Sequence, residues 1–162
     1  MNTHLEITTP FIRQAVAKDE AAVRDCAERA YAGYTGLIGR KPAPMMADFS
    51  MQISSGQVHV ALDGEEVFLG FIVFYPDELG MHIESVAVLP GAAGQGVGRA
   101  LVRFCEDQAG RQDIGLVHLY TNEKMAANLK IYARLGYIAI ARRIEGGFDR
   151  VFFQKKIRQK NC

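Results

Sequence analysis

The stretch V-A-V-L-P-G-A-A-G-Q-G-V-G-R-A-L-V, residues 86–102, carries the strongest structural signal in this 162-residue chain. The apolar run before Pro90 predicts a strand, and the residues from Gly98 onward predict a helix. Between them Gly94, Gly96 and Gly98 stand at alternate positions, so successive backbone N–H groups are exposed without side chains in the way. Together with the positive end of the following helix, this loop predicts a site for a phosphate or pyrophosphate.

Two common nucleotide-binding loops do not fit these residues. A Walker loop has a lysine directly after its last glycine, whereas Val97 follows Gly96 here. A dinucleotide-binding fingerprint needs a further glycine three residues after Gly96, where this chain has Arg99. That fingerprint also belongs to the first β-α unit of a repeating pattern, whereas four predicted strands precede this loop.

The chain as a whole predicts an α/β (α+β) fold, a mixed and mostly antiparallel sheet flanked by helices, in one domain spanning residues 1–162. Strand 81–89, the helix after it and strand 115–121 form a β-α-β unit, so these two strands are expected to be a parallel central pair. The other expected strands are 11–16, 57–62, 67–75, 137–143 and 151–157, and the expected helices are 18–31, 98–108 and 123–135.

The loop A-G-Q-G-V-G, residues 93–98, resembles the signature Q/R-x-x-G-x-G/A of the GNAT superfamily of N-acetyltransferases. Ala93 stands where that family usually has Gln or Arg. A second match is Y-A-R-L-G-Y, residues 132–137, at the end of a predicted helix. Asn128 lies one turn before Tyr132 on the same helix face, although the family's asparagine usually stands three residues earlier, where this chain has Met125. The resemblance covers about residues 11–157 and implies a single-domain GNAT fold in which strands 81–89 and 115–121 splay apart.

The resemblance implies direct transfer of the acetyl group of acetyl-CoA, the acyl-donor co-substrate, to a primary amine of a small molecule, amino acid or peptide. Tyr132 would return a proton to the leaving thiolate. Because Ala93 retains a backbone contact but loses a side-chain one, a non-catalytic acyl-CoA-binding module is the alternative function. The residues implied to bind the cofactor are Val86, Ala87, Val88, Ala93, Gly94, Gln95, Gly96, Val97, Gly98, Arg99 and Asn128.

A general base for the incoming amine is sought on strand 81–89. Strict alternation would place His82, Glu84, Val86 and Val88 on one face and Ile83, Ser85 and Ala87 on the other. Glu84 is the first candidate for the base, because a sheet covered by helices on both faces rarely buries a carboxylate that has no specific role. His82 and His118 are alternatives. The acceptor pocket is expected from Tyr31, Tyr34, Arg40 and Lys41 in an irregular segment and from the turn 145–150.

The composition limits the binding partners and the cellular compartment that can be expected for this chain. A net charge of +1 and a pI near 7.7 provide no basic field for nucleic acid. The three cysteines, Cys26, Cys105 and Cys162, have no C-x-x-C spacing, so we expect a reducing compartment and no metal site. No apolar run approaches the roughly 18 residues of a membrane span, and the N-terminus does not resemble a signal peptide, so a cytoplasmic protein is expected. A homodimer is suggested by family resemblance alone.

Overall fold

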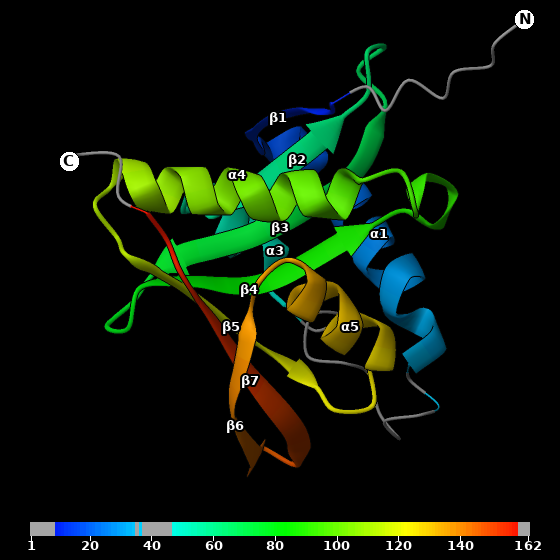
Figure 1. Ribbon diagram of the computed structural model, residues 1–162. Coiled ribbons are helices and arrows are strands. Elements are labelled where there is room, and N and C mark those ends of the chain that lie inside the picture. Colours follow the sequence, from blue (N-terminus) through cyan, green and yellow to red (C-terminus); the bar gives the residue numbers. More distant parts are fainter. Residues whose placement is uncertain (1–8, 35, 37–46, 159–162) are drawn as a thin grey trace, which may run out of the picture.

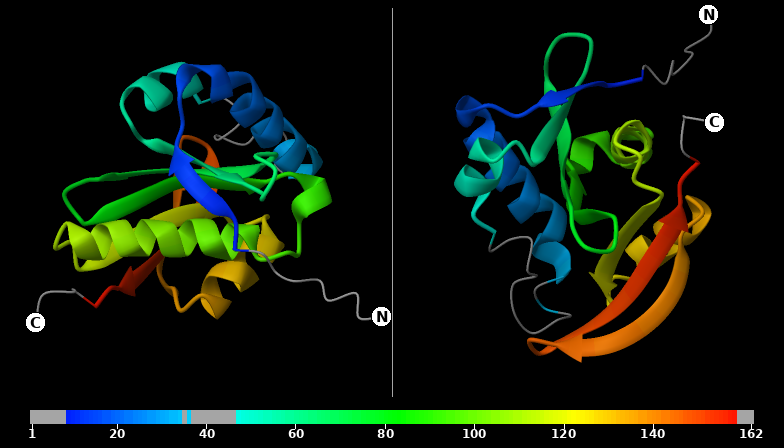
Figure 2. Two further views of the ribbon diagram at one scale, coloured as in Figure 1. Left: turned by 90° about the horizontal axis from the view of Figure 1, so that it is seen from above. Right: turned by 90° about the vertical axis from the view of Figure 1, so that its left-hand side faces the viewer.

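The computed structural model describes residues 9–34, 36 and 47–158 and contains one seven-stranded sheet with helices on both faces (Figures 1 and 2). Neighbouring strands are antiparallel except β4 and β5, which are parallel. The mixed, mostly antiparallel sheet and its parallel central pair are therefore confirmed. Across the sheet the strands are β1 (Phe11–Gln14), β2 (Val58–Leu62), β3 (Phe68–Pro76), β4 (Met81–Val88), β5 (Leu116–Asn122), β7 (Phe148–Lys156) and β6 (Ile138–Glu145).

The helices form two layers, which Figure 2 shows above and below the sheet. Buried residues of α1 (Glu20–Tyr31) and α3 (Phe49–Ser54) form one core with the sheet, including Val23 and Phe49. Buried residues of α4 (Val97–Arg111) and α5 (Ala126–Arg134) belong to the core on the opposite face, including Leu101 and Tyr132. Three short 3-10 helices complete the described structure: η1 (Ala17–Asp19), η2 (Ala32–Tyr34) and η4 (Pro90–Ala92).

A bulge in β4 changes which side chains face which core. Val73 of β3 pairs with Ser85 and Phe74 pairs with Ile83, so Glu84 is an extra residue between two successive pairs. An extra residue interrupts the alternation of side chains along a strand. Ile83 accordingly packs in the α4 core, whereas Val73, which lies opposite Ser85, packs in the α1 core. The expected sharing of one face by Ile83 and Ser85 is therefore wrong.

One helix was not expected, and the order of the last two strands across the sheet is not their order in the chain. The sequence did not predict α3, which has six residues and begins where the Asp48 side chain accepts the N–H of Met51 at 3.1 Å. Six residues are too few for a 3.6-residue periodicity to be visible. The last strand, β7, lies inside the sheet, and β6 forms its edge, with Ile144 77% exposed. Among the described residues, no helix has the length and apolar character needed to cross a bilayer.

Candidate functional site

The two parallel strands separate after a short pairing. β4 and β5 pair through Met81–Val117, His82–His118 and Ile83–Leu119, and beyond these pairs their arrows diverge in Figure 1. The expected splaying is thus present, and a cavity of about 320 Å³ occupies the opening. The residues lining it come from both helical layers and from the strand ends: Tyr31, Ala47, Asp48, Gln52, Ile83, Glu84, Ser85, Val86, Leu119, Tyr120, Thr121, Asn122, Met125, Asn128, Tyr132, Phe148 and Arg150.

The glycine loop leads from the end of β4 into α4, at the same end of β4 as the opening (Figure 1). Gly94 and Gly96 have φ of +79° and +84°, a conformation that costs glycine little and other residues much. In the described part of the chain, the backbone N–H groups of Gly94 to Gly98 find no acceptor. Residues 93–96 are exposed, as is Arg99 in the first turn of the helix. The loop therefore offers free amides and a helix N-terminus to an anion.

The edge of β4 that faces the opening is formed by alternate backbone groups. The N–H of Leu89 donates to Leu69 of β3 at 2.9 Å, so the backbone groups of Val86 and Val88, three and one positions away, are directed to the opposite edge. The carbonyl of Val86 accepts the hydroxyl of Tyr31 at 2.7 Å from that side. Of the three strand residues expected to bind cofactor, Val86 and Val88 thus present backbone groups to the opening, while those of Ala87 point to β3.

Glu84 places its carboxylate in the cavity lining, held by two neighbours. The side-chain amide of Gln52 in α3 donates to its Oε2, and the hydroxyl of Tyr75 in β3 donates to its Oε1 at 3.0 Å. Burial raises the pKa of Tyr75, and the negative charge of Glu84 raises it further. The phenol therefore stays protonated and acts as the hydrogen-bond donor. Gln52 and Tyr75 were missed in the sequence. Gln52 lies on the unpredicted α3, and Tyr75 reaches Glu84 because of the bulge.

The two histidines considered as alternative bases lie outside the cavity lining, where β4 and β5 are still paired. Their rings are neighbours, with centroids 4.8 Å apart. Burial, together with the nearby His118, lowers the pKa of His82 to about 4. His82 is therefore a neutral imidazole near pH 7, and its position favours Glu84 over it as the group that meets a substrate in the cavity.

Tyr132 reaches the cavity from α5, on the face opposite to α3. Its ring packs against Tyr137 and Phe153, with centroids 5.9 Å and 6.0 Å away. Burial raises its pKa to about 12, and within the described ranges its hydroxyl makes no hydrogen bond. Asn128, one turn earlier, also lines the cavity. Glu84 and Tyr132, which are 48 positions apart in sequence, thus line the same cavity.

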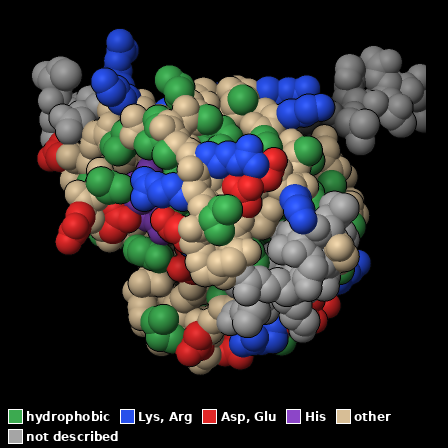
Figure 3. Space-filling model, turned by 90° about the horizontal axis from the view of Figure 1, so that it is seen from below, with side chains coloured by type: hydrophobic (Ala, Val, Ile, Leu, Met, Phe, Trp, Pro, Cys, Tyr) green, Lys and Arg blue, Asp and Glu red, His purple; other side chains and the backbone are tan. Residues whose placement is uncertain are grey.

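Some of the residues expected to form an acceptor pocket line the cavity. Tyr31 lines the cavity, and so do Phe148 and Arg150 from the hairpin at the start of β7. The guanidinium of Arg150 lies over the ring of Tyr120 at 4.3 Å and pairs with Glu145 at 3.2 Å. Arg40 and Lys41 lie outside the described residues. Figure 3 shows acidic and basic side chains interspersed on one face, which agrees with a small net charge.

Comparison with known proteins identifies relatives of this fold. A family model described as the Acetyltransferase (GNAT) family matches residues 21–137. A sequence comparison with curated proteins gives no significant match. The PaiA N-acetyltransferase of Thermoplasma acidophilum, solved with coenzyme A, is 15% identical with a TM-score of 0.75, covering 91% of this chain and 98% of its own. A GCN5-related N-acetyltransferase of Rhodopseudomonas palustris is 22% identical with a TM-score of 0.74, covering 95% and 99%. A GNAT acetyltransferase of Listeria monocytogenes is 14% identical with a TM-score of 0.71, covering 91% and 95%.

Proposed function

Because this chain belongs to the acetyltransferase (GNAT) family, we propose that it transfers the acetyl group of acetyl-CoA to a primary amine of a small molecule, amino acid or peptide. One observation carries the proposal. A single cavity, opened by the parting of β4 and β5, has the carboxylate of Glu84 and the phenol of Tyr132 in its lining. A carboxylate can take the proton that the amine must lose, and a phenol can give one to the departing sulfur.

The donor would lie along the loop and the open edge of β4. The free amides of Gly94 to Gly98 and the start of α4 suit the pyrophosphate, with Arg99 beside them. The pantetheine chain carries amide groups, and the backbone groups of Val86 and Val88 are the matching partners on the strand edge. Asn128 borders the same cavity and would contact the donor from α5. The similar protein of Thermoplasma acidophilum, solved with coenzyme A, supports this class of donor.

The acceptor would enter from the side of α3. Glu84 and Asp48 are two carboxylates in the lining, and such groups attract an ammonium ion. Gln52 and Tyr75 each donate to one oxygen of Glu84, and each oxygen retains a second lone pair for the amine. Glu84 takes a proton from the ammonium, directly or through water, and thereby frees the nitrogen lone pair for attack.

In the transfer step the amine nitrogen forms a bond to the thioester carbonyl carbon, and the carbon–sulfur bond breaks. The electron pair of that bond leaves on sulfur as a thiolate. Tyr132, whose pKa of about 12 keeps it protonated near neutral pH, gives its proton to the sulfur. The proton that Glu84 takes from the ammonium passes to solvent, so Glu84 can accept the second proton, which the nitrogen loses after bonding to the carbonyl carbon. This second proton returns through solvent to the phenolate of Tyr132. The products are the acetylated amine, free coenzyme A and one proton released to solvent.

The test measures acetyl-CoA consumption and binding separately. A panel of amines, amino acids and peptides is incubated with acetyl-CoA and the protein, and the released thiol and acetylated products are quantified. Calorimetry in the absence of amine measures acetyl-CoA binding. Turnover with at least one amine supports the proposal. Binding without turnover on any amine favours the non-catalytic acyl-CoA-binding module, which Ala93 at the usual Gln or Arg position keeps as the second candidate. Absence of binding contradicts both.

A further inference from the structure

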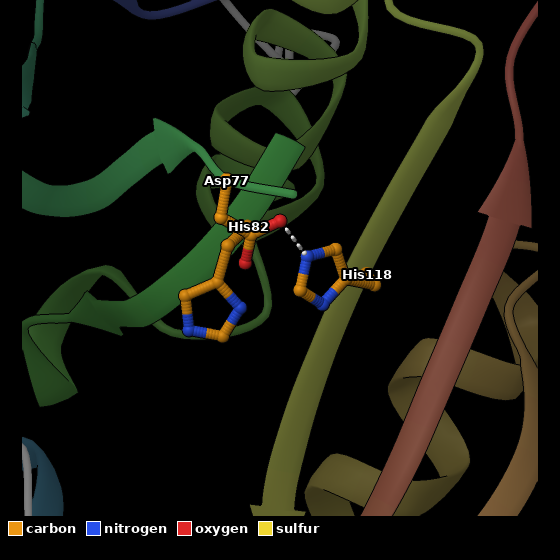
Figure 4. Close-up of side chains that lie close together, drawn as sticks. All are labelled: Asp77, His82 and His118. Atoms are coloured by element: carbon orange, nitrogen blue, oxygen red, sulfur yellow. Dashed lines mark hydrogen bonds and ion pairs between the residues drawn. The ribbon is translucent and has the colours of Figure 1, made fainter. Parts of the chain in front are cut away.

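Three side chains with metal-binding atoms meet at the closed end of the opening between β4 and β5. Asp77 belongs to the turn between β3 and β4, His82 to β4 and His118 to β5, and Figure 4 shows the three turned toward one another. One potential ligand atom from each lies within 4.8 Å of the other two. His82 and His118 are paired residues on adjacent parallel strands, so the sheet itself fixes their spacing.

His82 contributes an observation of its own. The residue is 7% exposed, and its Nδ1 atom has no hydrogen-bond partner among the described residues. In Figure 4 this nitrogen is on the side of the ring that faces His118 and Asp77. A buried polar atom without a partner costs free energy, and such an atom in a folded protein calls for an explanation such as a bound ion.

The side chains of Asp77 and His118 are close together and held in place by hydrogen bonds, as metal ligands usually are. Nε2 of His118 and Oδ1 of Asp77 are 2.8 Å apart. The same carboxylate accepts the N–H groups of Leu79 and Gly80 at 2.9 Å and 3.1 Å, which fixes its orientation in advance of ion binding. The side chains of Asp77 and His118 are 34% and 12% exposed, so an ion can reach the cluster from solvent.

The donor set selects the class of ion. Two imidazole nitrogens and one carboxylate suit Zn²⁺ and similar divalent transition metals, whereas Mg²⁺ and Ca²⁺ prefer oxygen ligands throughout. Zinc bonds of about 2.0–2.2 Å place two ligand atoms of one tetrahedral ion about 3.3–3.6 Å apart. Side-chain rotations that move the ligand atoms by about an ångström therefore complete the site. We infer that Asp77, His82 and His118 bind one divalent transition-metal ion of the Zn²⁺ type, with its fourth position open to water.

Such an ion would connect the β3–β4 turn, β4 and β5 next to the point where the two strands separate. The pairing of β4 with β5 covers three residue pairs, and His82–His118 is the middle one. A metal held by both histidines and by the preceding turn would fasten the sheet where it begins to open. We therefore expect metal binding to stabilise the fold as well as to fill the site.

The experiment uses the untagged full chain, treated with chelator and freed of it, in the absence of coenzyme A. Zn²⁺ is titrated in competition with a chromophoric chelator, and Co²⁺ is titrated while visible absorption is recorded. We expect one Zn²⁺ per chain, a visible spectrum typical of four-coordinate Co²⁺, and a rise in Tm of about 5–10 °C at free Zn²⁺ near 100 times its Kd. None of these readouts depends on acetyl transfer.

The variants H82F, H118Q and D77N each remove one ligand. Loss of a group that merely orients a ligand costs about 10- to 100-fold in affinity, so loss of a ligand should cost about 100-fold or more and abolish the Tm shift. The matched control is H59F. His59 lies on β2 and also has a buried Nδ1 without a partner among the described residues, but it is outside the cluster.

The control distinguishes Zn²⁺ binding by the three-residue cluster from Zn²⁺ binding to a single buried histidine. Unchanged Zn²⁺ binding in H59F, with loss in the ligand variants, supports the inference. Failure of the wild-type chain to bind Zn²⁺ at one per chain overturns it. Unchanged affinity in both H82F and H118Q overturns it as well. If H82F does not fold, as judged by circular dichroism, H118Q and D77N decide the outcome.

Discussion

Replacing Tyr132 with phenylalanine removes one oxygen atom from the cavity and keeps the ring. The ring packing against Tyr137 and Phe153 is retained, and among the described residues no hydrogen bond to the hydroxyl is lost. We therefore expect the free energy of unfolding to change by less than about 0.5 kcal/mol. Any effect on turnover then reports on the hydroxyl and not on a damaged fold.

The expected effect on turnover follows from the role of Tyr132 as the acid. A positioned proton donor contributes about 10²- to 10⁴-fold to a rate, or about 2.7–5.5 kcal/mol of barrier. A thiol with a pKa near 8.5 is a good leaving group and needs little help, so the lower end applies. We expect kcat of Y132F to fall about 100-fold, with the Kd for acetyl-CoA changed by no more than about 2-fold, because the hydroxyl acts in the transition state.

The assay follows released thiol with the best amine of the panel, and calorimetry measures acetyl-CoA binding. The matched control is Y137F, because the Tyr137 hydroxyl donates to Glu106 at 2.8 Å and lies outside the cavity lining. Losing a hydrogen bond to a charged group should lower stability by about 1.5–3 kcal/mol and leave kcat unchanged. Wild-type turnover in Y132F would remove the hydroxyl from the mechanism. An equal loss of turnover in both variants would show that packing, and not proton transfer, is responsible.

Three further outcomes are expected. Gly94→Ala, at φ +79°, should weaken acetyl-CoA binding about 10-fold in calorimetry, since holding alanine in that conformation costs about 1–2 kcal/mol. Glu84→Gln should lower kcat/KM at pH 7 by about 100-fold or more in the thiol assay, because an amide cannot take the amine proton. Asp19→Asn should lower the free energy of unfolding by about 1–2 kcal/mol at pH 7 in urea titrations, because Asp19 pairs with Arg13 at 2.8 Å. The hydrogen bond from Arg13 lowers the pKa of Asp19 from 3.8, so this stabilisation is present above pH 3.8 and is lost as the pH falls through the lower folded-state value.

Each outcome has a control within the chain. Gly146→Ala, at φ +57° in the β6–β7 turn, introduces similar strain and should leave acetyl-CoA affinity unchanged. Glu106→Gln changes a carboxylate that is outside the cavity lining and should leave kcat/KM unchanged. For Asp19, a stability difference between variant and wild type that does not decrease as the pH falls below 3.8 would refute the role of its charge.

Two of the features that the sequence predicted are built from backbone and follow from local residue types. Gly94 and Gly96 have positive φ in the loop, and glycine is the residue type that adopts this conformation at little cost. The parallel pairing of β4 and β5 follows from a strand, a helix and a strand in succession. Both features depend on local residue types, so a single sequence contains the information that they require.

The parts that could not be predicted depend on contacts between distant segments. The bulge at Glu84 has no glycine to mark it, and its position follows from the registers of Val73–Ser85 and Phe74–Ile83. The helix that brings Gln52 to Glu84 has six residues and is stabilised by burial of Phe49 and Ile53. An isolated helix of that length would not form in water, because nucleation is costly, so tertiary packing determines it.

The parting of β4 and β5 explains how groups from opposite faces of one sheet can act on the same molecule. Glu84 is held from the α3 layer through Gln52, whereas Tyr132 belongs to the core of the α4 and α5 layer. In a continuous sheet a layer of paired backbone would lie between them, because every strand is bonded to both neighbours. Since the pairing ends at Ile83 and Leu119, both side chains reach one cavity. A thioester placed in the gap would then meet the amine and its base on one side and the proton donor on the other, as addition to a carbonyl and departure of sulfur require.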